Sequence, residues 1–192
     1  MTRKATKTPK SPRYSLPWSI DKMLILLEKE GLHPVAPDIM AQHLGYTNAK
    51  SGQASTVLGT LRMYGMLKKG PQRRDIISED VRKYKYTPDT DEKHQLIRAW
   101  LHSPRVFSAI LQKYNDELPS DAAFRYELIQ EHGFTEEAAN KFIKLFKESV
   151  EFCDSFKSND STHEADNELS ETQDDVLPEP ENNEESPIAN NT

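Results

Sequence analysis

The chain has 192 residues, of which 35% are hydrophobic and 29% charged, and its net charge is −6. The apolar fraction is low for a chain that packs along its whole length, so we expect part of it to stay unfolded. The single cysteine, Cys153, excludes an intrachain disulfide, and no apolar run approaches the roughly 20 residues of a membrane span. We therefore expect a cytoplasmic protein that does not enter a membrane.

Charge is distributed unevenly along the chain. Residues 154–192 hold twelve carboxylates and one lysine, a net charge of −11, so the total of −6 leaves +5 for residues 1–153. The first thirteen residues contain no acid and five cations, namely Arg3, Lys4, Lys7, Lys10 and Arg13. A basic body with an acidic tail favours nucleic-acid binding more than the overall charge suggests.

Hydrophobic periodicity predicts three short helices in the first third of the chain. Pro17 suits the opening turn of the first helix, and Pro37 opens the second. A tight connection leads to the third helix, with Thr47 or Asn48 available as its N-cap, and Gly65 ends it. In each helix, apolar residues recur at i, i+3, i+4 and i+7, which is typical of one buried face: Ile20, Met23, Leu24 and Leu27; Pro37, Met40, Ala41 and Leu44; Ala54, Val57, Leu58 and Leu61.

Two short strands follow and are the only β signal in the chain. We predict strands over residues 66–69 and 73–77, joined by a turn at residues 70–72, and then a short helix capped by Ser78. Beyond this point the pattern is purely helical, with apolar residues at the core spacing of four helices. These four helices make a thin bundle, which we expect to pack on the N-terminal part of the chain or on a second copy.

These segments divide the chain into four parts. We predict a disordered basic arm (residues 1–13), an N-terminal domain (residues 14–88), a helical domain (residues 89–153) and a disordered acidic tail (residues 154–192). The fold class is mainly α with one small β-hairpin.

The order of three short helices and a hairpin resembles a winged helix-turn-helix domain. The stretch IMAQHLGYTNAKSGQASTVLGTLRMYGMLKKG carries the resemblance: Ala-x-x-Leu-Gly on the supporting helix, spaced apolar residues on the next helix, and Gly-Met-Leu before the hairpin. The resemblance covers residues 17–86, and the layout of the whole chain resembles uncharacterised bacterial winged-helix proteins. It implies a DNA-binding domain without catalytic residues.

The resemblance also implies a site on double-stranded DNA. In this family the start of the third helix enters the major groove, and the hairpin (the wing) lies on the phosphate backbone. The candidate DNA-binding residues are therefore short polar groups near the helix start and cations of the wing: Asn48, Lys50, Ser51, Gln53, Thr56, Lys68, Lys69, Arg73 and Arg74. Nine cations and three acids between Lys50 and Lys85 give a net charge of +6, which supplies the salt-dependent part of binding.

The outward face of the third helix is made of small residues. Opposite its buried face lie Gly52, Thr56, Gly59, Thr60 and Met63. Glycine costs a helix roughly 1 kcal/mol relative to alanine, so two glycines on one face indicate close approach of either DNA or a second helix. With so little charge on this face, we predict modest sequence specificity and an affinity carried largely by the wing and the basic arm.

We therefore predict a DNA-binding regulator of transcription, prokaryotic or from a phage. The alternative is a non-catalytic adaptor whose winged helix and helical bundle bind protein partners or a second copy. The acidic tail has three readings: a solubilising appendage, a segment that folds back and competes with DNA, or a partner-binding segment around the sequence DDVLPEP.

Other chemistry finds little support in the sequence. Six scattered histidines have no cysteine partners at metal spacing, and the chain lacks a glycine-rich phosphate loop. Asp121, Glu127 and Glu131 read as solvated sides of helices. We expect no catalytic residues, no metal site and no cofactor.

Overall fold

The structure is a computed structural model that describes residues 10–115 and 118–157. The described residues form eight α-helices, one 3-10 turn and a two-stranded antiparallel sheet. The elements are α1 Leu16–Glu30, α2 Pro37–His43, α3 Gly52–Met63, β1 Leu67–Lys69, η1 Pro71–Arg73, β2 Asp75–Ile77, α4 Glu79–Tyr86, α5 Thr90–His102, α6 Arg105–Tyr114, α7 Asp121–Gln130 and α8 Glu136–Lys157. The mainly helical class with one small hairpin is confirmed.

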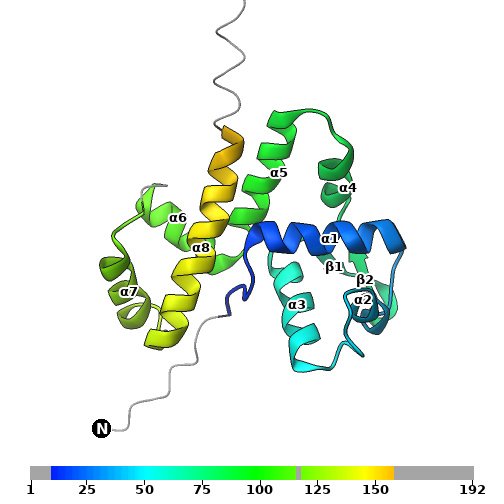
Figure 1. Ribbon diagram of the computed structural model, residues 1–192, viewed down its shortest axis with the longest axis horizontal. Coiled ribbons are helices and arrows are strands. Elements are labelled where there is room, and N and C mark those ends of the chain that lie inside the picture. The colour runs from blue at the N-terminus through cyan, green and yellow to red at the C-terminus, as the bar shows by residue number, and fades with distance from the viewer. Residues whose placement is uncertain (1–9, 116–117, 158–192) are drawn as a thin grey trace, which may run out of the picture.

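The elements are arranged around a central pair of helices. α5 and α8 run side by side, with α1, α2, α3 and the hairpin on one side and α6 and α7 on the other (Figure 1). Apolar side chains from both sides join in one hydrophobic cluster that extends from Leu16 to Cys153. The boundary predicted at residue 88 therefore does not separate two cores.

Aromatic contacts and a buried hydrogen bond join the two sides. The ring of Tyr64, which follows α3, meets the ring of Phe107 in α6 edge-on, with 6.0 Å between centroids. The backbone N–H of Leu16, at the start of α1, donates to Ser149 Oγ of α8 at 2.9 Å. The first N–H groups of a helix have no acceptor inside the helix. This bond gives one of them an acceptor and holds the start of α1 against α8.

The third helix begins later than the sequence predicted. Ser51 is its N-cap and accepts a hydrogen bond from the Ala54 N–H, so the predicted caps Thr47 and Asn48 are wrong. Asn48 caps a turn instead, because its Oδ1 accepts from the N–H groups of Lys50 and Ser51. The residues before Gly52 are thus held in a tight turn and not in helix.

The hairpin has a third backbone contact that the sequence did not reveal. In the hairpin itself, Leu67 pairs with Ile77 and Lys69 with Asp75. Val35, between α1 and α2, forms an antiparallel bridge with Asp75 through N–H···O bonds of 2.8 and 2.9 Å in both directions. A single bridging residue has no periodicity, so it gave no signal in the sequence.

Both ends of the folded body differ from the predicted boundaries. Ser11 and Pro12 are buried, although residues 1–13 were predicted to be a disordered arm. We call residues 10–13 the N-terminal segment. At the other end, α8 continues to Lys157, past the predicted start of the tail at residue 154. The remaining residues of the predicted arm and tail lie outside the described residues.

A search of the described helices finds none with the length and hydropathy that a bilayer crossing requires.

Candidate nucleic-acid interface

One face of α3 has open space in front of it. Gly52, Thr56, Gly59 and Met63 share this face because successive helical residues are about 100° apart. A Cβ atom added at Gly52 or at Gly59 would meet no atom within 4 Å. Packing inside the described chain therefore does not explain either glycine. We call these four residues the open stripe.

The N-terminal segment covers one flank of the open stripe. Thr60, which the sequence placed on the outward face, is only 1% exposed. Its Oγ1 accepts a hydrogen bond from the backbone N–H of Arg13 at 3.2 Å and donates to the Thr56 carbonyl at 2.9 Å. The expectation that Thr60 faces outward is wrong, because its side chain is buried and bonded to the backbone of Arg13.

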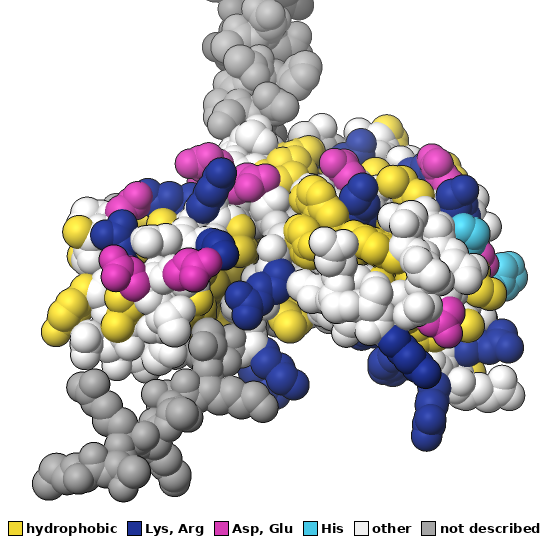
Figure 2. All heavy atoms as spheres, turned by 60° about the horizontal axis from the view of Figure 1, so that its bottom comes forward, with side chains coloured by type: hydrophobic (Ala, Val, Ile, Leu, Met, Phe, Trp, Pro, Cys, Tyr) yellow, Lys and Arg dark blue, Asp and Glu magenta, His cyan; other side chains and the backbone are white. Residues whose placement is uncertain are grey.

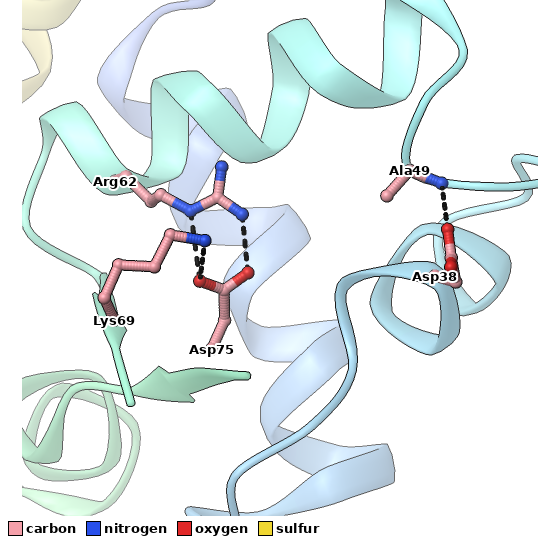
Figure 3. A network of polar contacts seen from close by, with 5 residues as sticks. All are labelled: Asp38, Ala49, Arg62, Lys69 and Asp75. Carbon is pink, nitrogen blue, oxygen red and sulfur yellow. Dashed lines mark hydrogen bonds and ion pairs between the residues drawn. The ribbon is translucent and has the colours of Figure 1, made fainter. Parts of the chain in front are cut away.

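The hairpin lies on the opposite flank of α3. Arg62 donates from Nε and from one terminal nitrogen to the two carboxylate oxygens of Asp75 in β2, at 3.1 and 2.5 Å (Figure 3). Lys69 Nζ lies 3.0 Å from the same carboxylate. Asp75 is completely buried, so the two cations neutralise a charge that has no access to water. The open stripe thus lies between the N-terminal segment and the hairpin.

Cations stand on both flanks of the stripe. On the first flank, Lys10 and Arg105 line a surface hollow of about 500 Å³ together with Met63. On the second flank, the cations of the hairpin are all exposed: Lys68, Lys69, Arg73 and Arg74. In Figure 2, uncharged white atoms cover the middle of the right-hand lobe, and dark-blue lysine and arginine side chains project around them. Arg105 was not among the predicted residues, since it lies far from α3 in sequence.

The predicted base-reading residues divide into two groups. Asn48 and Ser51 accept backbone hydrogen bonds in the turn and cap before α3, and the Thr56 hydroxyl donates to the Gly52 carbonyl at 2.7 Å. Their polar atoms are thus partly engaged in local structure. Lys50 and Gln53 are exposed, and the described part of the chain records no side-chain hydrogen bond for either. They are the predicted residues best placed to reach a ligand.

The four hairpin cations predicted to contact phosphates also form two groups, those bonded within the described fold and those that are not. Lys69 is paired with Asp75, and Arg74 donates to the Pro34 carbonyl at 3.3 Å. For Lys68 and Arg73, no ion pair is recorded among residues 10–115 and 118–157. The net charge of +6 therefore overstates the charge available to a ligand. Arg62, Arg82 and Lys85 of that set are also paired within the fold.

An acidic side chain from α2 contacts the turn before α3. Asp38, in the first turn of α2, accepts a hydrogen bond from the Ala49 N–H at 2.8 Å (Figure 3). This bond fixes the turn between α2 and α3 in place. It also places a negative charge near the start of α3, which disfavours an anionic group at that point.

The hairpin tip has an unusual backbone. Gln72 and Arg73 both have positive φ angles, 55° and 59°, which side chains other than glycine rarely adopt. Such backbone strain is often found at binding sites, where it holds a side chain in a fixed position. Here it presents the exposed side chains of Gln72 and Arg73 at the end of the hairpin.

A second polar cluster lies between α6 and α7. The sequence placed Glu127 on a solvated face, but the residue is only 5% exposed, so that reading is wrong. Its carboxylate accepts a hydrogen bond from the Tyr114 hydroxyl and lies 2.9 Å from Lys113 Nζ. Burial raises the pKa of Glu127, but the bonds from Tyr114 and Lys113 outweigh burial, and its pKa is lowered overall.

This cluster includes three groups of the kind that bind metals. One ligand atom from each of Glu127, Glu131 and His132 lies within 4.8 Å of the others. However, Lys113 Nζ already lies 2.9 Å from Glu127 and 3.0 Å from Glu131. The lysine ammonium therefore supplies the positive charge that the two carboxylates need, and the cluster is a structural ion network.

Comparison of the chain with family models, with curated proteins and with solved structures found no match. The function is therefore inferred from the open stripe of α3 and from the cations on its two flanks.

Proposed function

We propose that this protein is a DNA-binding regulator that places the open stripe of α3 in the major groove. The observation that carries the proposal is the open stripe itself, with its two glycines that no contact in the described chain requires and with cations on both sides. A major groove about 12 Å wide admits one helix, and phosphates line both of its edges. The stripe would meet the groove floor, and the flanks would meet the phosphates.

The order of elements supports the same proposal. The chain runs through α1, the bridging residue Val35, α2, α3 and the two strands of the hairpin. This is the order of a winged helix-turn-helix domain, in which the third helix and the wing contact DNA together. The ion pair between Arg62 and Asp75 would keep these two parts in a fixed relation.

The side chains available for contact indicate how the affinity would arise. Near the stripe, Gln53 and Lys50 are exposed, whereas Lys10, Arg105, Lys68 and Arg73 stand around it as phosphate ligands. Few groups can read bases, so the sequence specificity would be modest. Most of the binding free energy would come from release of counterions and would fall steeply with salt.

A salt titration of binding to random duplex DNA tests the proposal. The informative variant is the double substitution Lys68→Gln/Arg73→Gln, because neither side chain has an ion pair in the described fold. We expect it to weaken binding and to reduce the slope of log K against log salt by about 2, roughly one for each phosphate that is no longer neutralised. Fluorescence anisotropy of a labelled duplex measures both quantities.

The matched control is the double substitution Lys83→Gln/Arg98→Gln. Both residues are exposed, and they lie on α4 and α5, which Figure 1 shows across α1 from α3. Lys83 belongs to the basic set counted in the sequence, but its helix is away from the stripe. The double substitution changes the net charge by the same amount as Lys68→Gln/Arg73→Gln. The control should keep the parent slope. Equal slopes for all three proteins, or no binding to duplex DNA at low salt, would contradict the proposal and favour the adaptor function.

A further inference from the structure

A second surface groove lies between the start of α1 and α8. It has a volume of about 340 Å³, and its lining includes Arg13, Tyr14, Trp18, Lys144 and Leu145. Figure 1 shows that the chain entering α1 passes beside α8 at this point. We call this hollow the α1–α8 groove.

The groove combines an aromatic wall with positive charge. The rings of Tyr14 and Trp18 are stacked, with 4.0 Å between centroids and 13° between planes, and Trp18 is half-buried. Lys22 Nζ lies 5.3 Å from the centre of the Trp18 ring. Arg13 and Lys144 are exposed, and no ion pair is recorded for either within the described residues. A flat apolar wall beside cations suits a peptide that has both aliphatic and acidic side chains.

Two more charged residues line the groove. Lys141 is paired with Glu137 at 2.5 Å, but both side chains are well exposed, so the pair gives way readily to another carboxylate. Glu148 accepts a hydrogen bond from the Ser15 hydroxyl at 2.7 Å. The Glu148 carboxylate is thus already engaged by a residue of the fold. The groove keeps an excess of positive charge.

We propose that the α1–α8 groove binds the segment Asp174–Pro180 of this same chain, the sequence DDVLPEP. Residues 158–192 contain eleven carboxylates and no lysine or arginine. Within them, Val176 and Leu177 form an adjacent aliphatic pair with acids on both sides. The aliphatic pair would lie on the stacked rings, and the carboxylates would meet Arg13 and Lys144.

The chain is long enough to return to the groove. The described chain leaves α8 at Lys157, and Lys144 lies thirteen residues earlier on the same helix, a distance of about 20 Å at 1.5 Å per residue. The sixteen residues 158–173 can span up to roughly 50 Å when extended. A tethered segment of this length has an effective concentration of the order of millimolar at the groove, so a weak contact is enough to hold it.

The contact would oppose DNA binding, and this consequence alone rests on the proposed function. The backbone of Arg13 is hydrogen-bonded to Thr60 of α3, so the groove adjoins the flank of the open stripe. Carboxylates placed there would repel DNA phosphates and occupy a cation on that flank. The acidic segment would then regulate access to the helix.

Acrylamide quenching of tryptophan fluorescence tests the contact in the full chain. Trp100 is only 4% exposed, so quenching reports mainly on Trp18, and a Trp18→Phe variant identifies its share. We expect the substitution Val176→Ser/Leu177→Ser to raise the quenching constant of Trp18 by about twofold, because the tethered segment no longer covers the ring. The control Ile188→Ser, also in residues 158–192, should leave it unchanged.

The groove side of the contact is tested with Lys141→Gln/Lys144→Gln. This variant should raise quenching as the aliphatic substitution does, whereas Lys83→Gln/Arg98→Gln should not. Equal quenching in all variants would overturn the proposal. If Lys141→Gln/Lys144→Gln instead leaves quenching unchanged and weakens DNA binding, the groove is a DNA surface and the proposal is also overturned. A chain that binds no DNA would refute the proposed function and leave the quenching result intact.

Discussion

Arg62 and Asp75 form an ion pair with two hydrogen bonds that ties α3 to the second strand of the hairpin. The Asp75 carboxylate is completely buried, and its backbone also bridges to Val35. One residue therefore joins α3, the hairpin and the chain before α2. The same contact that stabilises the fold also fixes the two surfaces that the proposed function brings to DNA.

We expect Asp75→Asn to destabilise the protein strongly. The change removes the buried carboxylate that accepts both hydrogen bonds from Arg62, and loss of hydrogen bonds to a charged group costs about 2 kcal/mol. Urea unfolding followed by circular dichroism measures the loss. The control is Glu79→Gln, which breaks an exposed pair with Arg82 and should change the free energy of unfolding by less than about 1 kcal/mol. Similar losses for the two variants would refute the structural role of Asp75.

At Gly59, one substitution should change stability and DNA affinity in opposite directions. A Cβ at this position meets no atom within 4 Å, so Gly59→Ala should stabilise the protein by up to about 1 kcal/mol through its higher helix propensity. The same methyl group would stand between α3 and the groove floor, so we expect weaker DNA binding. Thermal unfolding and anisotropy measure the two effects. A variant that is more stable and binds DNA as tightly as the parent would show that the open stripe does not contact DNA.

The sequence predicted local structure well where periodicity was strong. The four residues predicted for the buried face of α3 are all buried, and α2 begins at Pro37 as expected. In α1 and α2 most of the predicted residues are buried, but Leu24, Pro37 and Leu44 are only partly so. Proline restricts its own φ angle, and the apolar spacing defines which face of a helix is buried. Both signals lie within one segment, so they can be read without knowing the tertiary contacts.

The features that the sequence missed depend on contacts between distant residues. Thr60 is buried and bonded to the backbone of Arg13, and Arg105 at the start of α6 lines the same hollow as Met63. Glu127 is buried among partners from another helix. A pattern within one helix holds no information about what another segment places against it. The place of Arg105 beside the stripe and the burial of Thr60 could therefore be found only in the structure.

The strained hairpin tip gives a prediction about backbone energy. Gln72 has a φ of 55°, a region in which a side chain costs roughly 1 kcal/mol and glycine nothing. We therefore expect Gln72→Gly to raise the free energy of unfolding by up to about 1 kcal/mol, as measured with urea. The control Gln53→Gly, in the first turn of α3, should be destabilising, since that position is helical. A loss of stability in Gln72→Gly would contradict the left-handed conformation of the tip.

The ion network around Glu127 predicts how stability depends on pH. Burial alone would raise the pKa of Glu127, but Tyr114 and Lys113 bind its charged form and lower the pKa below the ordinary value of 4.5. A carboxyl group with a lowered pKa in the folded state stabilises the protein fully above its unfolded pKa, and this contribution is lost as the pH falls through the folded pKa. We expect Glu127→Gln to be less stable than the parent at pH 7 and the difference to shrink below pH 4.5. Urea unfolding at pH 7, 4.5 and 3 measures this difference.

The control is Glu137→Gln. Its lost pair with Lys141 is exposed, so added salt should abolish any difference in stability from the parent. A difference for Glu127→Gln that stays constant from pH 7 to pH 3 would show that the carboxylate is not charged in the folded protein.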